Sequence, residues 1–299
     1  MRVAATLVAV TLSGAHVHGA TVTDAGGRKV EVVDTSKILS IGGDITEILY
    51  SLGLEAKIIG VDATSQFPTD ALKQKTNVGY MRALSTEGVL SIAPHLIIAS
   101  ASAGPPEVVK ALKQTSVPYL EVEDGHSPEG VIEKVRLVAQ ALDVTAEGDK
   151  LAQKIDGEFK ALADQRAKLG KPRRAVFILS AHSGRATVGG SGTSADAIFK
   201  LAGLDNAAAT VNGFKPVVDE ALVEMMPDVV VTMRRSSGTH DVDKVMSMPG
   251  MQSTPAGQMK RTVIMDGLYL LGFGPRTPAA ALDLMRQVYP EVAASGLTK

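Results

Sequence analysis

Ile38-Leu-Ser-Ile-Gly-Gly-Asp-Ile-Thr-Glu-Ile-Leu-Tyr-Ser-Leu-Gly53 indicates a strand, a tight turn and a helix in direct succession. The run Ile38–Ile41 predicts a short buried strand, the two glycines after it allow a turn, and Asp44 is expected to cap a helix that ends at Gly53. A second apolar run at 58–61 predicts the next strand. Strands that alternate with helices predict a parallel sheet with helices on its faces.

Upstream of this stretch, residues 21–33 alternate between polar and apolar around Asp-Ala-Gly-Gly and predict a β-hairpin. In the second half, the run 175–179 predicts a strand, and a helix over 194–202 is expected to end at Gly203. The same order of elements therefore occurs once in each half of the chain.

A second internal similarity links the halves. Residues 84–94 precede the apolar run 96–98, and residues 217–227 precede the run 229–231. In both segments a glutamate stands seven residues before a proline, Glu87 in the first and Glu220 in the second. This recurrence favours two related lobes over one long sheet.

Between the halves, residues 128–142 and 145–169 have helical composition and apolar residues at helical spacing. We therefore expect two Rossmann-like α/β lobes that are joined by a long backbone helix and have a ligand cleft between them. The predicted organisation is a signal peptide at 1–20, an N-terminal lobe at 21–127, a linking helical segment at 128–170 and a C-terminal lobe at 171–299.

Composition restricts the class of protein and its compartment. The chain has 299 residues, 45% hydrophobic and 21% charged residues, a formal charge of −1 and no cysteine. This balance is typical of a globular protein and does not favour nucleic acid as a partner. The charged start, short apolar run and small residues before position 21 predict a cleaved signal peptide. With no cysteine for lipid attachment, we expect a protein free in the periplasm and not a lipoprotein.

Tyr80 is the most informative polar aromatic residue. It stands in the loop Asn77-Val-Gly-Tyr-Met-Arg82, where no helical or strand periodicity explains its burial. Arg82 lies two residues away, and a guanidinium close to a phenol favours the ionised phenolate. Phenolate is an anionic ligand suited to ferric iron, and tyrosine is a known axial ligand of haem. An ordinary half-buried tyrosine is the alternative.

Other candidate residues follow strands of the second half. His182 comes after the strand at 175–179, and strand ends of parallel sheets line clefts, so we expect it to touch a ligand. Arg234 and Arg235 follow the run 229–231 and could pair with a ligand carboxylate, although adjacent arginines are commonly a solvated pair. No histidine pair has zinc spacing. No catalytic set emerges either, so we predict that the chain is not an enzyme.

The chain resembles the haem-binding periplasmic proteins of bacterial ABC importers, within the helix-linked (class III) substrate-binding proteins. The resemblance covers the whole mature chain. Its motifs are Ser40–Leu49, Gly79-Tyr80-Met81-Arg82, Thr193–Ile198 with Leu201-Ala-Gly203, and Leu270-Leu-Gly-Phe-Gly-Pro-Arg-Thr-Pro278.

This resemblance implies that Tyr80 is the haem iron ligand and that Arg82 hydrogen-bonds its oxygen. It also places Met81, His182 and either Arg234 or Arg235 in the haem pocket. The implied ligand is haem b as cargo, and one or two haems are compatible with it.

The resemblance further implies docking onto arginines of an ABC permease, coupled to its ATPase, through Glu87 and Glu220. A monomer is expected. The same fold carrying a ferric siderophore or corrinoid is the alternative. A periplasmic haem store or haem-handling enzyme is an alternative of a different class.

Overall fold

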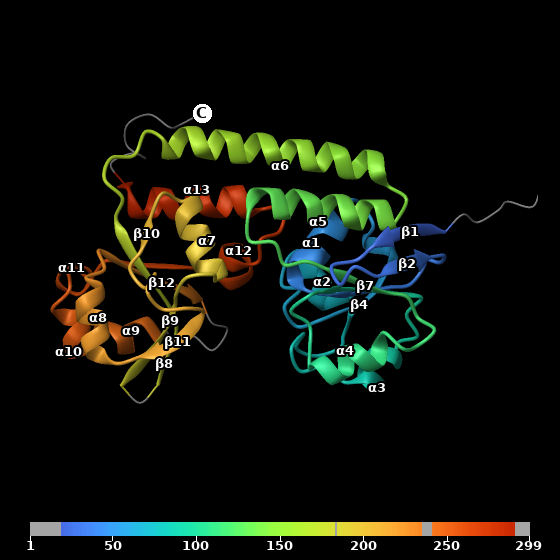
Figure 1. Ribbon diagram of the computed structural model, residues 1–299, viewed down its shortest axis with the longest axis horizontal. Coiled ribbons are helices and arrows are strands. Elements are labelled where there is room, and N and C mark those ends of the chain that lie inside the picture. Colours follow the sequence, from blue (N-terminus) through green and yellow to red (C-terminus); the bar gives the residue numbers. More distant parts are fainter. Residues whose placement is uncertain (1–18, 183, 235–240, 291–299) are drawn as a thin grey trace, which may run out of the picture.

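A computed structural model describes residues 19–182, 184–234 and 241–290 of the chain. Two α/β lobes lie side by side, and one long helix, α6 (Thr145–Arg166), runs across the top of both (Figure 1). Its buried residues, Gly148, Ala152, Ile155, Phe159 and Leu162, recur every three or four positions and form one stripe. Through this stripe α6 joins the lobes. Among the described residues, no helix is long and apolar enough to cross a membrane.

The first lobe contains a five-stranded sheet of order β5-β4-β3-β6-β7 in which every pair is parallel. The stretch Ile38–Ile41 forms the central strand, and all four of its residues are buried. A separate antiparallel hairpin, β1-β2, covers part of this lobe. The elements are β1 (Ala20–Thr23), β2 (Lys29–Val32), β3 (Ile38–Ile41), α1 (Gly43–Ser51), the 3-10 helix η1 (Glu55–Lys57), β4 (Ile58–Val61), α2 (Thr69–Gln74), β5 (Thr76–Asn77), α3 (Thr86–Leu90), β6 (Leu96–Ser100), α4 (Pro106–Leu112), β7 (Tyr119–Val122) and α5 (Pro128–Ala141).

The second lobe has a mixed sheet of order β11-β9-β8-β12-β13, with β10 paired to β8. The predicted parallel pairing is confirmed for β8, β12 and β13, but the antiparallel part was not predicted: β8 turns back into β9 as a hairpin, and β11 pairs antiparallel to β9. The elements are β8 (Arg174–His182), β9 (Arg185–Gly189), α7 (Ser194–Leu201), β10 (Asp205–Asn206), β11 (Phe214–Val217), α8 (Asp219–Met225), β12 (Val229–Arg234), α9 (Asp241–Met246), α10 (Pro249–Gln252), α11 (Pro255–Gln258), β13 (Thr262–Asp266), α12 (Gly267–Leu271) and α13 (Thr277–Val288).

The cap of helix α1 differs from the prediction. The helix begins at Gly43, its N-cap is Gly42 with φ +123°, and Asp44 lies inside the first turn. The Asp44 carboxylate is instead paired with Lys134 of α5. The free N–H groups of Gly42 and Gly43 are satisfied by the side chains of Asp62 and Thr64, which follow β4.

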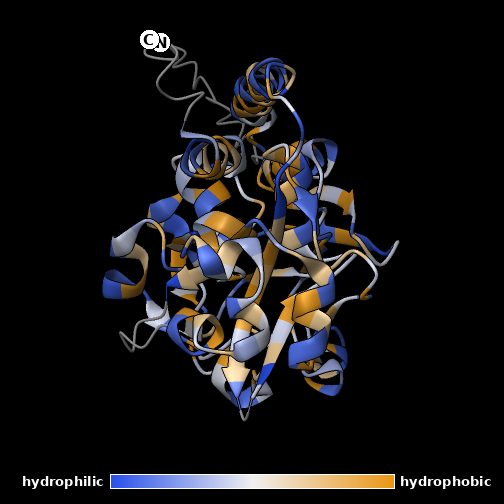
Figure 2. Cartoon of the chain, turned by 90° about the vertical axis from the view of Figure 1, so that its left-hand side faces the viewer, coloured by the Kyte–Doolittle hydropathy of each residue, from blue (hydrophilic) through white to orange (hydrophobic). Residues whose placement is uncertain are grey.

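The hydrophobic core is continuous between the lobes on the side of α5, α6 and α13. One cluster of buried residues contains Ile45 and Val135 of the first lobe, Phe159 of α6, and Phe199 and Leu284 of the second lobe. Figure 2 shows hydrophobic residues concentrated in the strands and on the inward sides of the helices. Because this packing crosses the boundary between the lobes, they are held together by apolar burial as well as by the connecting helix.

Candidate functional site

Tyr80 begins a β-turn that follows β5 at the carboxyl edge of the first sheet. The turn is closed by the N–H of Ala83, which donates to the carbonyl of Tyr80 at 2.8 Å. Gly79 has φ +99°, a conformation that a residue with a Cβ rarely adopts, and it directs the chain into the turn. Tyr80 is 50% exposed, so its phenol is accessible from outside the lobe.

Backbone bonds on both sides fix this turn to the neighbouring loops. The N–H of Ala63, after β4, donates to the carbonyl of Gly79 at 2.8 Å. The N–H of Gly104, after β6, donates to the carbonyl of Met81 at 2.9 Å. The Met81 side chain packs against the apolar cluster of the first lobe. The turn therefore presents Tyr80 outward from a well-held backbone.

Arg82 lies in the same turn and is exposed. Among the described residues, no hydrogen bond or ion pair is formed by its side chain or by the Tyr80 hydroxyl. The structure thus places Tyr80, Met81 and Arg82 together, and both polar side chains are accessible to an incoming ligand. That Arg82 acts on Tyr80 remains a prediction.

His182 and Arg234 lie in the second lobe. They are the last residues of β8 and β12, which are parallel neighbours, so both belong to the same edge of the sheet. Both are exposed. His182 is paired with Arg185 at the turn of the β8–β9 hairpin, which lies at the lower edge of this lobe in Figure 1. Arg235 lies outside the described residues.

An interlobe ion pair that sequence reasoning missed joins Glu47 of α1 to Arg276. The Arg276 Nε and Nη2 donate to the two carboxylate oxygens of Glu47, each at 2.9 Å. The guanidinium also lies 3.6 Å from the ring centroid of Phe67 and 4.9 Å from that of Tyr269. Burial raises the pKa of Glu47, and the hydrogen bonds from Arg276 oppose that shift.

A second buried pair lies beside the first. Lys134 of α5 pairs with Asp44 and donates to the carbonyl of Phe273 at 3.3 Å. The ring of His126 contacts Phe273 edge-on, with the centroids 5.0 Å apart. Burial lowers the pKa of His126, which favours the neutral imidazole. The loop around Phe273 and Arg276, quoted above as a sequence motif, therefore ties the second lobe to α1 and α5.

Glu87 and Glu220 occupy the first turns of α3 and α8, and both are exposed. The two helices lie in different lobes, on the side of the molecule away from α6 (Figure 1). The helix-then-strand similarity that paired these glutamates in the sequence is confirmed, since α3 precedes β6 and α8 precedes β12.

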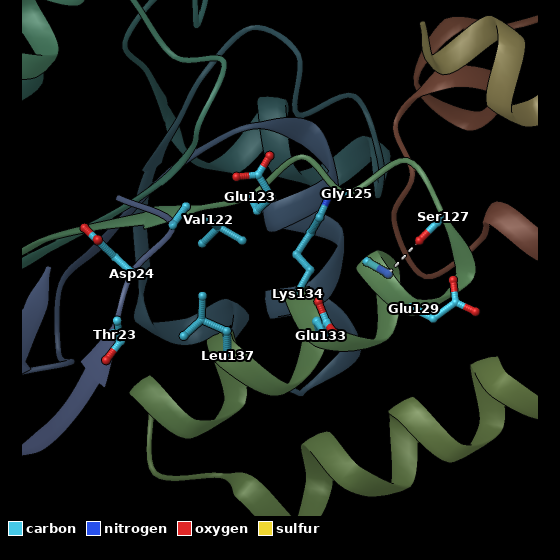
Figure 3. Close-up of a pocket in the computed structure, with 12 residues that line it drawn as sticks. Thr23, Asp24, Val122, Glu123, Gly125, Ser127, Glu129, Glu133, Lys134 and Leu137 are labelled. Atoms are coloured by element: carbon cyan, nitrogen blue, oxygen red, sulfur yellow. Dashed lines mark hydrogen bonds between the residues drawn. The ribbon is translucent and has the colours of Figure 1, made fainter. Parts of the chain in front are cut away.

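A cavity of about 480 Å³ lies in the first lobe between the end of β1, the loop after β7 and α5 (Figure 3). Carboxylates surround it, and its one cationic lining residue, Lys134, is paired with Asp44. It is separate from the turn of Tyr80, none of whose residues lines it. Within the described part of the chain, no group of three or more His, Cys, Asp or Glu residues could hold a metal ion.

Three known proteins illustrate what this chain is similar to. The apo periplasmic heme-binding protein RhuT from Roseiflexus sp. RS-1 is 35% identical with a TM-score of 0.81, covering 87% of this chain and 100% of that one. The periplasmic heme-binding protein BhuT in complex with two hemes is 37% identical with a TM-score of 0.80, covering 86% and 98%. The uncharacterized ABC transporter substrate-binding lipoprotein YvrC of Bacillus subtilis (strain 168) is 26% identical, covering 91% of this chain and 86% of its own length.

The two-lobed architecture and the sequence similarity point to one family. A family model described as periplasmic binding protein matches residues 38–268, which span both sheets. The chain belongs to the periplasmic binding protein family.

Proposed function

We propose that this protein captures haem in the periplasm and delivers it to an ABC transporter of the inner membrane. The observation that carries the proposal is the exposed Tyr80 on a well-held turn at the carboxyl edge of the first sheet. The structural similarity supports haem as the cargo, because RhuT and BhuT, which this chain resembles, are described as heme-binding proteins.

In this proposal Tyr80 supplies the axial ligand to ferric haem. A phenolate oxygen is hard and anionic, which suits ferric iron, and one protein ligand is enough to anchor a haem whose four equatorial positions are filled by the porphyrin. Arg82 supplies positive charge next to the phenolate and stabilises its ionised form. Met81 anchors the turn, because its side chain packs against the apolar cluster of the first lobe.

The ligand lies in a cleft between the lobes and meets the second lobe on its other face. Arg234 and Arg235 are proposed to pair with carboxylates of the ligand, because guanidinium–carboxylate pairs are strong and directional. His182, at the neighbouring strand end, is proposed to contact the ligand from the same lobe. The cargo is haem b, with one or two molecules bound.

Delivery proceeds through Glu87 and Glu220, which bind arginines of the permease from separate lobes. The protein acts as a monomer without enzymatic activity.

It reaches the periplasm through a cleaved signal peptide at residues 1–20 and is not lipid-anchored. Residues 21–127 and 171–299 form the two lobes, and 128–170 form the link, whose first helix, α5, packs on the first lobe.

Titration of the purified protein with hemin tests this function. We expect a saturable shift of the Soret band with one or two equivalents bound. Cobalamin and a ferric siderophore, added in separate titrations, should neither bind tightly nor displace hemin. Hemin without a saturable shift, or displacement by either competitor, would reject haem as the cargo.

A further inference from the structure

Asp62 is a completely buried carboxylate that follows β4, with 0% of its surface exposed. It accepts four hydrogen bonds: from the N–H of Gly42 at 2.8 Å, the N–H of Thr64 at 2.8 Å, the hydroxyl of Thr64 at 3.0 Å and the hydroxyl of Ser65 at 3.2 Å. Among the described residues it has no ion-pair partner. A buried carboxylate is tolerated only when such donors replace water, so these bonds fix the loop after β4 firmly.

The loop that Asp62 organises contacts both sequence neighbours of Tyr80. Ala63 donates its N–H to the carbonyl of Gly79 at 2.8 Å. The hydroxyl of Thr64 lies 3.8 Å from the Sδ of Met81. Tyr80 itself makes no side-chain hydrogen bond to a described residue, so the backbone on either side fixes the point and direction in which its side chain leaves the turn.

The same carboxylate also reaches the start of α1. Gly42, the N-cap of α1, donates to Asp62, and the Gly43 N–H donates to the Thr64 hydroxyl at 3.0 Å. Helix α1 carries Glu47, whose pair with Arg276 joins the second lobe. Asp62 therefore links the Tyr80 turn to the rigid centre of the first lobe and, through α1, to the junction between the lobes.

We propose that Asp62 is a positioning residue for Tyr80, which holds the phenol oxygen where it meets the iron. This inference rests on the proposed function of Tyr80 as the haem ligand. It assigns to Asp62 an effect on the iron–tyrosine bond, in addition to any effect on stability. Groups that orient a metal ligand without touching the metal typically change metal affinity by about 10- to 100-fold when removed.

The test is the Asp62→Asn variant in the full chain. Asparagine keeps the size of the side chain but replaces one acceptor oxygen with an NH₂ group. At the Oδ2 position this group would face the N–H of Thr64, and at the Oδ1 position it would face the donors of Gly42, Thr64 and Ser65. We expect the variant to bind hemin with a dissociation rate raised about 10-fold or more and with weakened tyrosinate modes in the resonance Raman spectrum.

Asp196→Asn is the matched control. Asp196 is 5% exposed, lies in the second lobe, and accepts hydrogen bonds from Lys200 at 2.7 Å and Asn206 at 3.0 Å. We expect it to lower stability without changing the tyrosinate modes or the dissociation rate. If Asp62→Asn does not fold, the same two measurements are made on Thr64→Val. This variant removes the hydroxyl that donates to Asp62 and accepts from the N–H of Gly43.

The outcomes distinguish a failure of the positioning role of Asp62 from a failure of the proposed role of Tyr80 as the haem ligand. Wild-type tyrosinate modes and a wild-type dissociation rate in Asp62→Asn, or in Thr64→Val if that variant is needed, would overturn the positioning role. So would an equal change in Asp196→Asn. Absence of tyrosinate modes in the wild-type complex would instead reject Tyr80 as the ligand.

Discussion

At the scale of single residues, two buried carboxylates of helix α1, Asp44 and Glu47, are held by cations from distant parts of the chain. Asp44 is a residue type that commonly caps helices, but its carboxylate pairs instead with Lys134, which lies 90 residues away in the sequence. Arg276 was noticed only as part of a motif, and its partner Glu47 is 229 residues away. Local patterns carry no information about such pairs, so the capping prediction failed and the interlobe ion pair was missed. Tyr80, in contrast, could be singled out as a candidate because its loop has no periodicity that would bury it, and its role as a ligand stays a prediction.

Glu47 gives a prediction for the pH dependence of stability. Burial raises its pKa in the folded state above the ordinary value of 4.5. The folded state therefore retains the proton to higher pH than the unfolded chain. The stabilisation is complete below about pH 4.5 and decreases as the pH rises through the folded-state pKa.

We expect the free energy of unfolding of the wild type, relative to that of Glu47→Gln, to be larger at pH 4 than at pH 7, so that the wild type is relatively more stable at the lower pH. Urea denaturation of both proteins at the two pH values measures this difference. A difference that is the same at both values, or larger at pH 7, would contradict the assignment of the shift to Glu47.

At the scale of elements, the buried strand β3 and helices such as α1, α6 and α7 could be predicted because their apolar spacing is local. The β8–β9 hairpin was missed. Residues 182–185, His-Ser-Gly-Arg, contain a Ser-Gly pair of the kind that marks tight turns, and this was the available indication of a hairpin. The strand at 175–179 was interpreted as the start of a parallel unit, so the antiparallel strand after it was not expected.

Helix α6 offers a paired test of how closely the elements pack. A Cβ added at Gly148 would lie 2.2 Å from the Cβ of Ala139 on α5, whereas a Cβ at Gly157, on the same helix, would meet nothing within 4 Å. We expect Gly148→Ala to destabilise the protein by about 1–3 kcal/mol through overpacking. Gly157→Ala should stabilise it by about 0.5–1 kcal/mol through helix propensity.

Thermal or urea unfolding of the two variants measures both effects. Stabilisation by alanine at both positions would show that α5 and α6 do not approach each other as closely at Gly148 as described.

At the scale of the whole molecule, the two lobes form one body because packing and ion pairs cross their boundary. The continuous apolar cluster and the contacts of Lys134 and Arg276 hold α1 and α5 against the second lobe. Glu87 and Glu220 therefore extend from a body in which the lobes are tied together. The two-lobed shape was predictable from the internal similarity, but this cross-lobe packing was not, since it depends on residues from distant parts of the chain.

Docking through the two lobes predicts a clear separation between binding and transport. Glu87→Arg combined with Glu220→Arg should leave hemin affinity unchanged within about 2-fold, because both residues are exposed and lie outside the Tyr80 turn. Stimulation of the transporter ATPase should be abolished, because like charges then face the permease arginines. Glu224→Arg, at another exposed glutamate of α8, is the control for added charge. Normal stimulation by the double variant would refute the docking role.

The central claim is that Tyr80 binds haem iron, and resonance Raman spectroscopy of the ferric-haem complex of Tyr80→Phe against wild type tests it most directly. The side chain is 50% exposed and its hydroxyl bonds no described residue, so the variant should fold as the wild type does. We predict tyrosinate modes in the wild-type complex, their loss in Tyr80→Phe, and a weaker hemin affinity. Identical spectra with unchanged affinity would contradict the claim.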